Sequence, residues 1–453
     1  MNLQEKTRRK LQEKLGMQNQ AVGMDGNEIL SRLNRLSKVK TIKDINQLTT
    51  VLFPGTYCPL MGAGMIASGI DDCLMVIIGT DECSYYAKNF NAVDRYSAVS
   101  DRCVSVVLDS QDVTFGSAES MHKAFKEIVE EYHPKCVMLV TTCVIEVIGD
   151  DYDAIAEELT KQYNIPVMAV HTEHFKCEDQ IPGLERAITA CSKIMDKQIC
   201  DGSVNVLGLH MGNFSETELH KFLKEAGIKL GVQLPGGCMA DEIRCAPAAK
   251  VNIVVNDIAL PLAQIMQEQY GIPYVYFNRF AAPEKILQAY QYLFDYMEIP
   301  LPVEVSAKFA ECKEWEQKTT VLAQGIPYIY GNTQYDCFEL NSYMCHLGFV
   351  PQLIQSNKLS ADNFEDIQSI LMTANPYICK AANIAPLQYV YDVLHPWFYM
   401  GHEYSDRLRR KGIAQLYTDQ ASKMLGFECN IFLLKLLQKA VADAKKFREE
   451  VGL

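Results

Sequence analysis

The chain has 453 residues, more than one hydrophobic core supports, so we expect two or three domains. Its composition, 48% hydrophobic and 22% charged, is typical of globular proteins, and no apolar run is long enough for a membrane helix. The 16 cysteines occur without an apolar export signal, which predicts a reducing, cytoplasmic location and no membrane contact. The formal net charge of -13 and the lack of a basic stripe argue against nucleic acid as a partner.

Lys and Arg are concentrated at the start of the chain, and we expect residues 1–45 to form a basic helical arm. A solvated amphipathic helix explains this charge, and docking to an acidic partner subunit is the alternative.

After the arm, apolar runs of four to eight residues alternate with longer helical patterns, which indicates repeated β–α–β units. The expected strands are residues 73–79, 105–108, 135–140, 167–170, 204–209, 251–255, 274–277, 328–330, 377–380 and 414–417. Helices are expected between them, for example at residues 117–132 and 261–270.

This pattern predicts an α/β protein with three Rossmann-like domains, whose parallel sheets are flanked by helices. We place the domains at residues 46–200, 201–302 and 303–430, with a C-terminal helix at 431–453. Pro300 and Pro302 mark the second junction. Nucleotide binding by this chain has no motif support, because neither Gly-x-Gly-x-x-Gly nor a P-loop occurs in the sequence.

Cys58, Cys83 and Cys143 each lie in a turn-rich setting beside an apolar run. Cys83 and Cys143 follow expected strands, and the carboxyl ends of neighbouring parallel strands face one crevice. Three thiolates in one crevice favour a soft metal, so we predict an iron–sulfur cluster at the strand ends. Because cysteine is often simply buried, a purely structural role is the alternative for each residue.

The residues around these cysteines resemble those of a known family. They read Pro54-Gly-Thr-Tyr-Cys58, then Gly62-Ala-Gly64, then Gly79 with Cys83 four residues on, and Thr141-Thr-Cys143-Val-Ile-Glu-Val-Ile-Gly-Asp-Asp151. This pattern resembles the catalytic-component subunits of nitrogenase and its relatives. The relatives include protochlorophyllide reductases, the reductive cyclase of coenzyme F430 synthesis, methylthio-alkane reductase and cofactor-assembly scaffolds.

The resemblance implies that Cys58, Cys83 and Cys143 bind an iron–sulfur cluster of the 4Fe-4S or eight-iron P-cluster type. The cluster would be shared across the interface with a homologous subunit, in a hetero- or homodimer or a tetramer. A separate iron–sulfur ATPase would supply electrons. Gly62 and Gly64 would let the backbone approach the cluster closely.

The Gly149-Asp150-Asp151 stretch is expected to be mostly structural, because acidic residues suit the first turn of the next helix.

His395 begins the stretch His-Pro-Trp-Phe-Tyr-Met-Gly401, which resembles the alpha-type segment whose histidine binds a second, complex metallocluster. A loop rich in His and Trp that forms a packed corner is the alternative, and His402 is a candidate proton donor. The cysteine that the alpha-type subunits use for the same metallocluster is absent, because the chain reads Val251-Asn-Ile-Val-Val-Asn256 there. Cys238 and Cys245 lie upstream of this segment.

His171, His174 and Cys177 follow the expected strand at residues 167–170 and would face the same crevice. The two histidines could supply protons to a small-molecule substrate, or they could be satisfied interior residues. His395, His171 and His174 are therefore the candidate catalytic residues.

Three functions compete on these grounds. We expect first the iron–sulfur subunit of a nitrogenase-like, ATP-driven two-component reductase, an oxidoreductase whose substrate cannot be read from the sequence. The second is a scaffold for the assembly of a complex metallocluster, which the missing cysteine favours mildly. The third is a non-metal α/β binding protein, because a fold alone does not fix a function.

Overall fold

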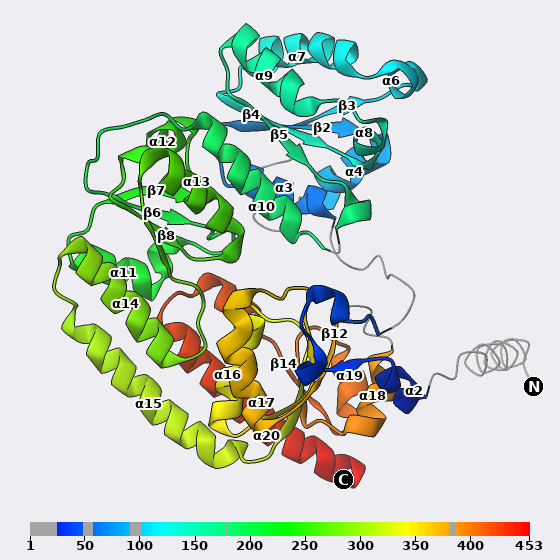
Figure 1. The fold of residues 1–453 in the computed structure, drawn as a ribbon, viewed down its shortest axis with the longest axis vertical. Coiled ribbons are helices and arrows are strands. Elements are labelled where there is room, and N and C mark those ends of the chain that lie inside the picture. Colours follow the sequence, from blue (N-terminus) through cyan, green and yellow to red (C-terminus); the bar gives the residue numbers. More distant parts are fainter. Residues whose placement is uncertain (1–24, 49–57, 91–100, 178, 381–385) are drawn as a thin grey trace, which may run out of the picture.

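The computed structural model describes residues 25–48, 58–90, 101–177, 179–380 and 386–453. Three mainly parallel sheets, each flanked by helices, follow one another along the chain (Figure 1). The predicted fold class is therefore confirmed. Within the described ranges, no helix is both long enough and apolar enough to cross a lipid bilayer.

The first sheet has the strand order β3-β2-β4-β5, and all of its strands run parallel. Its strands are β2 (Cys73–Gly79), β3 (Cys103–Val107), β4 (Cys136–Thr141) and β5 (Val167–His171). Its helices are α3 (Pro59–Ser68), α4 (Asp81–Phe90), α6 (Ser110–Phe115), α7 (Ala118–Tyr132), α8 (Cys143–Ile148), α9 (Tyr152–Tyr163) and α10 (Ile181–Ala190). Helices α7 and α9 cover one face of the sheet, and α3 and α10 cover the other (Figure 1).

Strand β2 is buried along its whole length because both faces of the sheet are covered. Its side chains point alternately to the two faces. Leu74, Val76 and Ile78 join the core beneath α7 and α9, whereas Met75 and Ile77 join the core beneath α3 and α10. This explains why the strand reads as a continuous apolar run and not as an alternating one.

The second sheet has the strand order β7-β6-β8-β9 and is also parallel. Its strands are β6 (Val204–Leu207), β7 (Leu230–Leu234), β8 (Val251–Val254) and β9 (Tyr274–Tyr276). Its helices are α11 (Glu218–Glu225), α12 (Ala240–Cys245), α13 (Leu260–Tyr270), α14 (Pro283–Met297) and the long α15 (Val303–Ala323). Gly271, at φ +74°, ends α13 in the left-handed conformation and turns the chain into β9.

The third sheet has the strand order β1-β12-β11-β10-β13-β14, in which only the pairing of β1 with β12 is antiparallel. Its strands are β1 (Asn34–Arg35), β10 (Pro327–Tyr330), β11 (Val350–Gln355), β12 (Tyr377–Cys379), β13 (Phe398–Met400) and β14 (Ala414–Leu416). Its helices are α2 (Gly26–Ser31), α16 (Cys337–Leu347), α17 (Phe364–Thr373), α18 (Leu387–Leu394), α19 (Ser405–Arg409) and α20 (Phe427–Val451).

The segment expected as a basic arm is described only from residue 25 onwards. Its described part joins the third sheet, because β1 pairs with the edge strand β12 and α2 packs against α18. Residues 1–24 lie outside the described residues.

The last helix, α20, connects the cores of the second and third domains. Phe427 and Ile431 pack into the second domain, whereas Leu433, Leu434 and Leu437 pack into the third. The helix also runs against α15. It is therefore an integral part of the fold and not an appended segment.

Candidate metal centre

The candidate site lies at the carboxyl edge of the first sheet, between β2 and β4. From β2 the chain crosses to β3 on one side, and β4 lies on the other side of β2. The space beyond such a reversal of strand order is the usual ligand site of an open parallel sheet. Cys83 lies in the first turn of α4, which follows β2, and Cys143 is the first residue of α8, which follows β4.

A close backbone approach holds these two strand ends together. Thr142 donates its backbone N–H to the carbonyl of Ile78 at 3.1 Å and its hydroxyl to the same carbonyl at 2.9 Å. A Cβ at Gly79 would lie 1.7 Å from Oγ1 of Thr142, so the approach requires glycine at that position. The segment before Cys143 is thereby fixed against the end of β2.

Cys58 reaches the crevice from the start of α3, and it packs against the same core as Cys83. It occupies the N-cap position of α3, directly before Pro59, and its carbonyl accepts the N–H of Met61 at 2.9 Å. Burial, together with the charges of Cys143, Cys83 and Cys177, raises the pKa of the Cys58 thiol to about 11, although the backbone N–H of Leu60 opposes the shift. The three predicted ligands are therefore brought together, and a fourth cysteine lies with them.

Cys143 has a backbone donor. Its Sγ accepts the N–H of His174 at 3.3 Å. His174 begins the single turn η3 (His174–Lys176), which follows β5. Hydrogen bonds from backbone N–H groups to cysteine sulfur tune the reduction potential of iron–sulfur clusters.

His171, predicted as a proton donor, is enclosed by two carboxylates. Its Nδ1 lies 2.7 Å from Oε1 of Glu146 and its Nε2 lies 3.1 Å from Oδ2 of Asp153. Burial lowers the pKa of His171, but the two carboxylates outweigh burial and raise it overall. Glu146 also accepts the hydroxyl of Thr141. Both ring nitrogens are therefore occupied within the protein.

Gly62 allows a close approach, but of a different kind from the one predicted. A Cβ at Gly62 would lie 2.3 Å from the carbonyl oxygen of Gln180, and one at Gly183 would lie 1.9 Å from that of Pro59. The two glycines let α3 and α10 pack backbone to backbone. Gly64 is buried in the same helix. The sequence predicted that Gly62 lets the backbone approach a cluster. In the structure, Gly62 lets α3 approach α10.

The Gly149-Asp150-Asp151 motif has the structural role expected. Gly149 ends α8 in the left-handed conformation, and Asp151 caps α9 by accepting the N–H of Ala154 at 2.9 Å. Asp150 accepts the N–H of Ser117 at 2.7 Å and its hydroxyl at 2.6 Å. The motif therefore ties the helix that begins with Cys143 to the turn between α6 and α7.

Large apolar side chains are exposed on the elements that follow the strands of this edge. Phe115 at the end of α6 is 86% exposed, Val147 in α8 is 74% exposed, and Phe175 in η3 is 56% exposed. We call these three residues the apolar rim. Sequence reasoning did not identify them, because exposure of an apolar side chain cannot be read from a local pattern.

The thiols suit a multi-iron cluster better than a single metal ion. Among the residues that the structure describes, no three His, Cys, Asp or Glu side chains are arranged to hold one ion. A cluster instead takes each thiolate on a different iron, so its ligands stand apart around a shared space. Cys58, Cys83 and Cys143 have the chemistry that such a cluster requires.

His395 and His402 are not brought to this crevice. His395 is exposed and ends α18 at φ +48°, at the amino end of β13. His402 follows the carboxyl end of β13, and its Nε2 lies 3.0 Å from Oδ1 of Asp419. The segment predicted as a loop around His395 contains a strand of the third sheet.

The segment Val251–Asn256, where a cysteine was expected from the alpha-type subunits, holds no thiol. Val255 is fully buried in the core, and Asn256 caps the next turn by accepting the N–H of Ile258. Cys238 is buried and donates to the carbonyl of Gly69, whereas Cys245 is exposed. Neither cysteine replaces the missing ligand at the end of β8.

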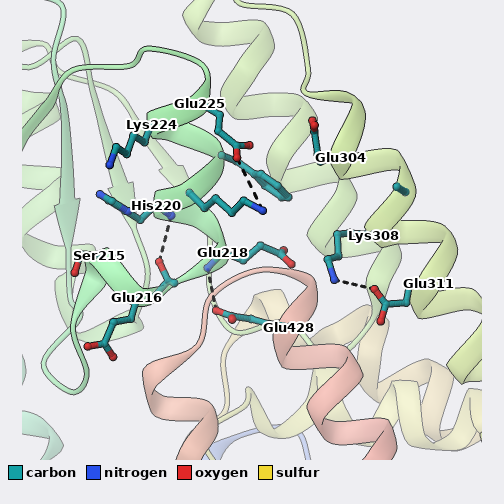
Figure 2. Close-up of a pocket in the computed structure, with 14 residues that line it drawn as sticks. Ser215, Glu216, Glu218, His220, Lys224, Glu225, Glu304, Lys308, Glu311 and Glu428 are labelled. Atoms are coloured by element: carbon teal, nitrogen blue, oxygen red, sulfur yellow. Dashed lines mark hydrogen bonds and ion pairs between the residues drawn. The ribbon is translucent and has the colours of Figure 1, made fainter.

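A separate pocket of about 970 Å³ lies between α11, α15 and the start of α20 (Figure 2). Two carboxylates there cap each other's helices. Glu218 accepts the N–H of Phe427 at 2.7 Å, and Glu428 accepts the N–H of Glu218 at 3.1 Å. This arrangement joins the second domain to α20, and nothing in it indicates a ligand.

Together, the fold and the crevice define an α/β protein with three sheets, which has Cys83 and Cys143 after strands at the carboxyl edge of the first sheet. The family model of nitrogenase component 1 type oxidoreductases matches residues 58–422, so the chain belongs to this family. The family resemblance stated from the sequence is confirmed.

The curated relatives include two kinds of protein, a cofactor biosynthesis protein and a nitrogenase subunit. The chain is 30% identical over 224 residues to the nitrogenase iron-molybdenum cofactor biosynthesis protein NifE of Clostridium pasteurianum, covering 48% of this chain and 49% of that protein. It is 25% identical over 273 residues to the nitrogenase molybdenum-iron protein alpha chain of Methanosarcina barkeri, covering 56% and 51%. The chain thus spans about half the length of the curated relatives it matches.

Among solved structures, the fold is similar to that of nitrogenase Cp1 at pH 6.5. The TM-score is 0.73 at 14% identity, over 87% of this chain and 94% of that chain. At this identity, the likeness shows the fold alone.

Proposed function

We propose that the chain is the iron–sulfur subunit of a nitrogenase-like, ATP-driven two-component reductase. Cys58, Cys83 and Cys143 would hold an iron–sulfur cluster, which supplies one-electron chemistry when bound. The observation that carries the proposal is the convergence of these three thiols where β2 and β4 end side by side. A small molecule would be the final electron acceptor.

The apolar rim supports a partner that delivers electrons. Val147 is exposed on α8, which carries Cys143, and Phe115 is exposed on α6, which follows β3, the neighbour of β2 in the sheet. Exposed apolar groups grouped at a site are typical of protein contacts. We assign the rim to the docking of protein partners, namely a homologous subunit and an iron–sulfur ATPase.

A scaffold for metallocluster assembly is the second candidate. The likeness to NifE and the lack of a thiol at Val255 favour it, because a chain that passes a metallocluster on needs fewer fixed ligands than one that retains it.

Anaerobic co-purification with metal analysis distinguishes the candidates, since it gives the metal, its stoichiometry and the partner chain together. Consumption of reductant with a small substrate and the ATPase would support the reductase. Transfer of a metallocluster to an acceptor protein without turnover would support the scaffold. Absence of iron and acid-labile sulfide after anaerobic isolation would refute both and favour a non-metal binding protein.

Cys143→Ala tests the cluster directly. We expect loss of the visible iron–sulfur absorbance, because a ligand that is also fixed to β2 and to η3 is removed. The far-UV circular dichroism should stay that of an α/β protein. An unchanged iron content in this variant would refute the assignment of Cys143.

A further inference from the structure

Strand β5 forms one edge of the first sheet, because within the described ranges it pairs with β4 alone. Pro166 turns its carbonyl towards β4, where it accepts the N–H of Val137 at 2.9 Å. Main-chain groups alternate in direction along a strand, so those of Met168 and Val170 also face β4, whereas those of Ala169 face outward. The outer edge of β5 is therefore a row of main-chain groups that β4 does not use.

The protein itself bonds the two ends of this outer edge. Val167 donates its N–H to the hydroxyl of Thr160 at 3.0 Å, and the carbonyl of His171 accepts Nη1 of Arg186 at 2.7 Å. Between these ends, among the residues that the structure describes, no group bonds to the N–H or to the carbonyl of Ala169. The middle of the edge is thus open although both ends are closed.

A groove of about 370 Å³ lies at this open part of the strand, and Val167 and Ala169 are in its lining. Helices α9 and α10, which cover opposite faces of the sheet, contribute its other main residues (Figure 1). Ala156 of α9 and Ala190 of α10 have small side chains, which leave room for another backbone beside β5. An open strand edge is a template for pairing with a further chain.

The charges of the groove indicate what kind of chain fits it. Its lining has three carboxylates and two cations: Asp153, Glu157, Glu185, Arg186 and Lys193. The carboxylates stand on both sides, because Glu157 lies on α9 and Glu185 lies on α10. Arg186 is already paired, since its Nη1 lies 2.8 Å from Oε2 of Glu173. A segment with Lys or Arg side chains therefore complements the groove better than an acidic one.

We propose that the groove along β5 binds an extended, basic segment of a partner protein, which joins the first sheet as a further strand. The N–H and the carbonyl of Ala169 pair with the backbone of that segment. Its Lys or Arg side chains reach Glu157 and Glu185. The groove lies at the edge strand and involves none of the three predicted cysteine ligands, so the inference stands or falls separately from the proposed function.

The first test measures the binding of short synthetic peptides to the full chain by fluorescence anisotropy. The probe is a fluorescein-labelled Ala-Lys-Val-Lys-Ala peptide with blocked ends. A peptide with Glu in place of both Lys residues should bind about tenfold more weakly or less, because its charge is reversed. Methylation of the central Val nitrogen should weaken binding by a similar factor of about ten, because a main-chain hydrogen bond is lost. No binding of the basic peptide, or equal binding of the three peptides, would overturn the inference.

The double variant Glu157→Lys and Glu185→Lys tests the groove from the side of the chain. Neither residue is buried, so the fold should persist. We expect the basic peptide to bind about tenfold more weakly, because two attractive charges become repulsive. Glu127→Lys, at an exposed position of α7, is the matched control and should leave binding unchanged. Equal binding to the double variant and to the wild type would contradict the assigned charge complementarity.

Hydrogen–deuterium exchange with mass spectrometry locates the bound peptide without any substitution. By the alternation along β5, the N–H groups of Ala169 and His171 both face outward. Fragments that contain β5 should exchange more slowly when the basic peptide is present. Fragments that contain β3, the opposite edge of the same sheet, should exchange at an unchanged rate. Protection at β3 instead, or at neither strand, would show that the peptide does not extend the sheet at β5.

Discussion

Glu218 is a buried carboxyl group with a pH-dependent contribution to stability. Burial, with a smaller effect from the charge of Glu428, raises its pKa from an ordinary value near 4.5 to about 7. The N–H of Phe427 and the hydroxyl of Tyr290 oppose this shift by donating to it. The folded protein therefore binds a proton at Glu218 that the unfolded chain releases above pH 4.5.

This difference in proton binding makes the free energy of unfolding depend on pH. The stabilisation that Glu218 contributes is fully present below about pH 4.5. It is lost as the pH rises through about 7, since the folded state holds more protons than the unfolded state between these pH values. Glu218→Gln should remove this slope, which amounts to at most about 3 kcal/mol in the free energy of unfolding. Urea unfolding between these pH values measures it.

Glu216→Gln is the control, because Glu216 lines the same pocket but is exposed. It should keep the wild-type slope. An equal slope in Glu218→Gln and in the wild type would contradict the assignment.

Contacts between residues far apart in the sequence, such as that of Glu218 with Phe427, could not be predicted from the sequence. Glu146 and Asp153, which enclose His171, lie 25 and 18 residues away from it along the chain. The sequence placed His171 at a strand end, where it is found, but only the fold reveals the two carboxylates.

At the scale of elements, the crossing of α3 and α10 fixes the position of Cys58. Gly62→Ala would place a methyl group 2.3 Å from the carbonyl oxygen of Gln180 and 2.7 Å from the backbone nitrogen of Leu184. Neither backbone atom can yield without moving a helix. We expect a loss of about 2 to 3 kcal/mol in the free energy of unfolding, measured with urea.

Ser68→Ala, at a half-exposed position of the same helix, should change that free energy by no more than about 0.5 kcal/mol. Similar stabilities for the two variants would show that α3 and α10 can separate without loss.

Length did not decide which strands were predictable, since β9, β12 and β14 have three residues each and were predicted. Strand β2 coincides with the expected residues 73–79, because covered parallel strands read as apolar runs. Strands β7, β11 and β13 were missed. β13 lies between Trp397 and Gly401, within the segment of His395 that was interpreted as a loop.

Cys83 and Cys143 could be placed from the strand pattern alone, because each follows a predicted strand. Cys58 could not, since it precedes a helix. Only the resemblance to a family connected it with the other two cysteines.

At the scale of the whole molecule, the apolar rim is expected to be a docking surface. Phe115→Ala should weaken docking of the iron–sulfur ATPase by about 2 kcal/mol, which is roughly 30-fold in affinity, because an exposed aromatic anchor is truncated. Cluster reduction by the ATPase should slow, whereas direct reduction by dithionite should be unchanged. Stopped-flow absorbance measures both rates.

Met372→Ala is the matched control, because Met372 is an equally exposed apolar residue on α17 of the third domain. It should leave both rates at the wild-type value. If Phe115→Ala does the same, the rim does not receive the electron donor.

Helix α20 is synthesised after every strand of the three sheets, yet it supplies apolar side chains to the cores of the second and third domains. Those two domains therefore remain open on the ribosome until α20 emerges. The first sheet takes nothing from that helix, although its core continues into residues of the second sheet's elements, such as Leu234 and Ile258. The first two sheets can therefore begin to pack together before α20 has been made, and we expect Cys58, Cys83 and Cys143 to meet at that stage.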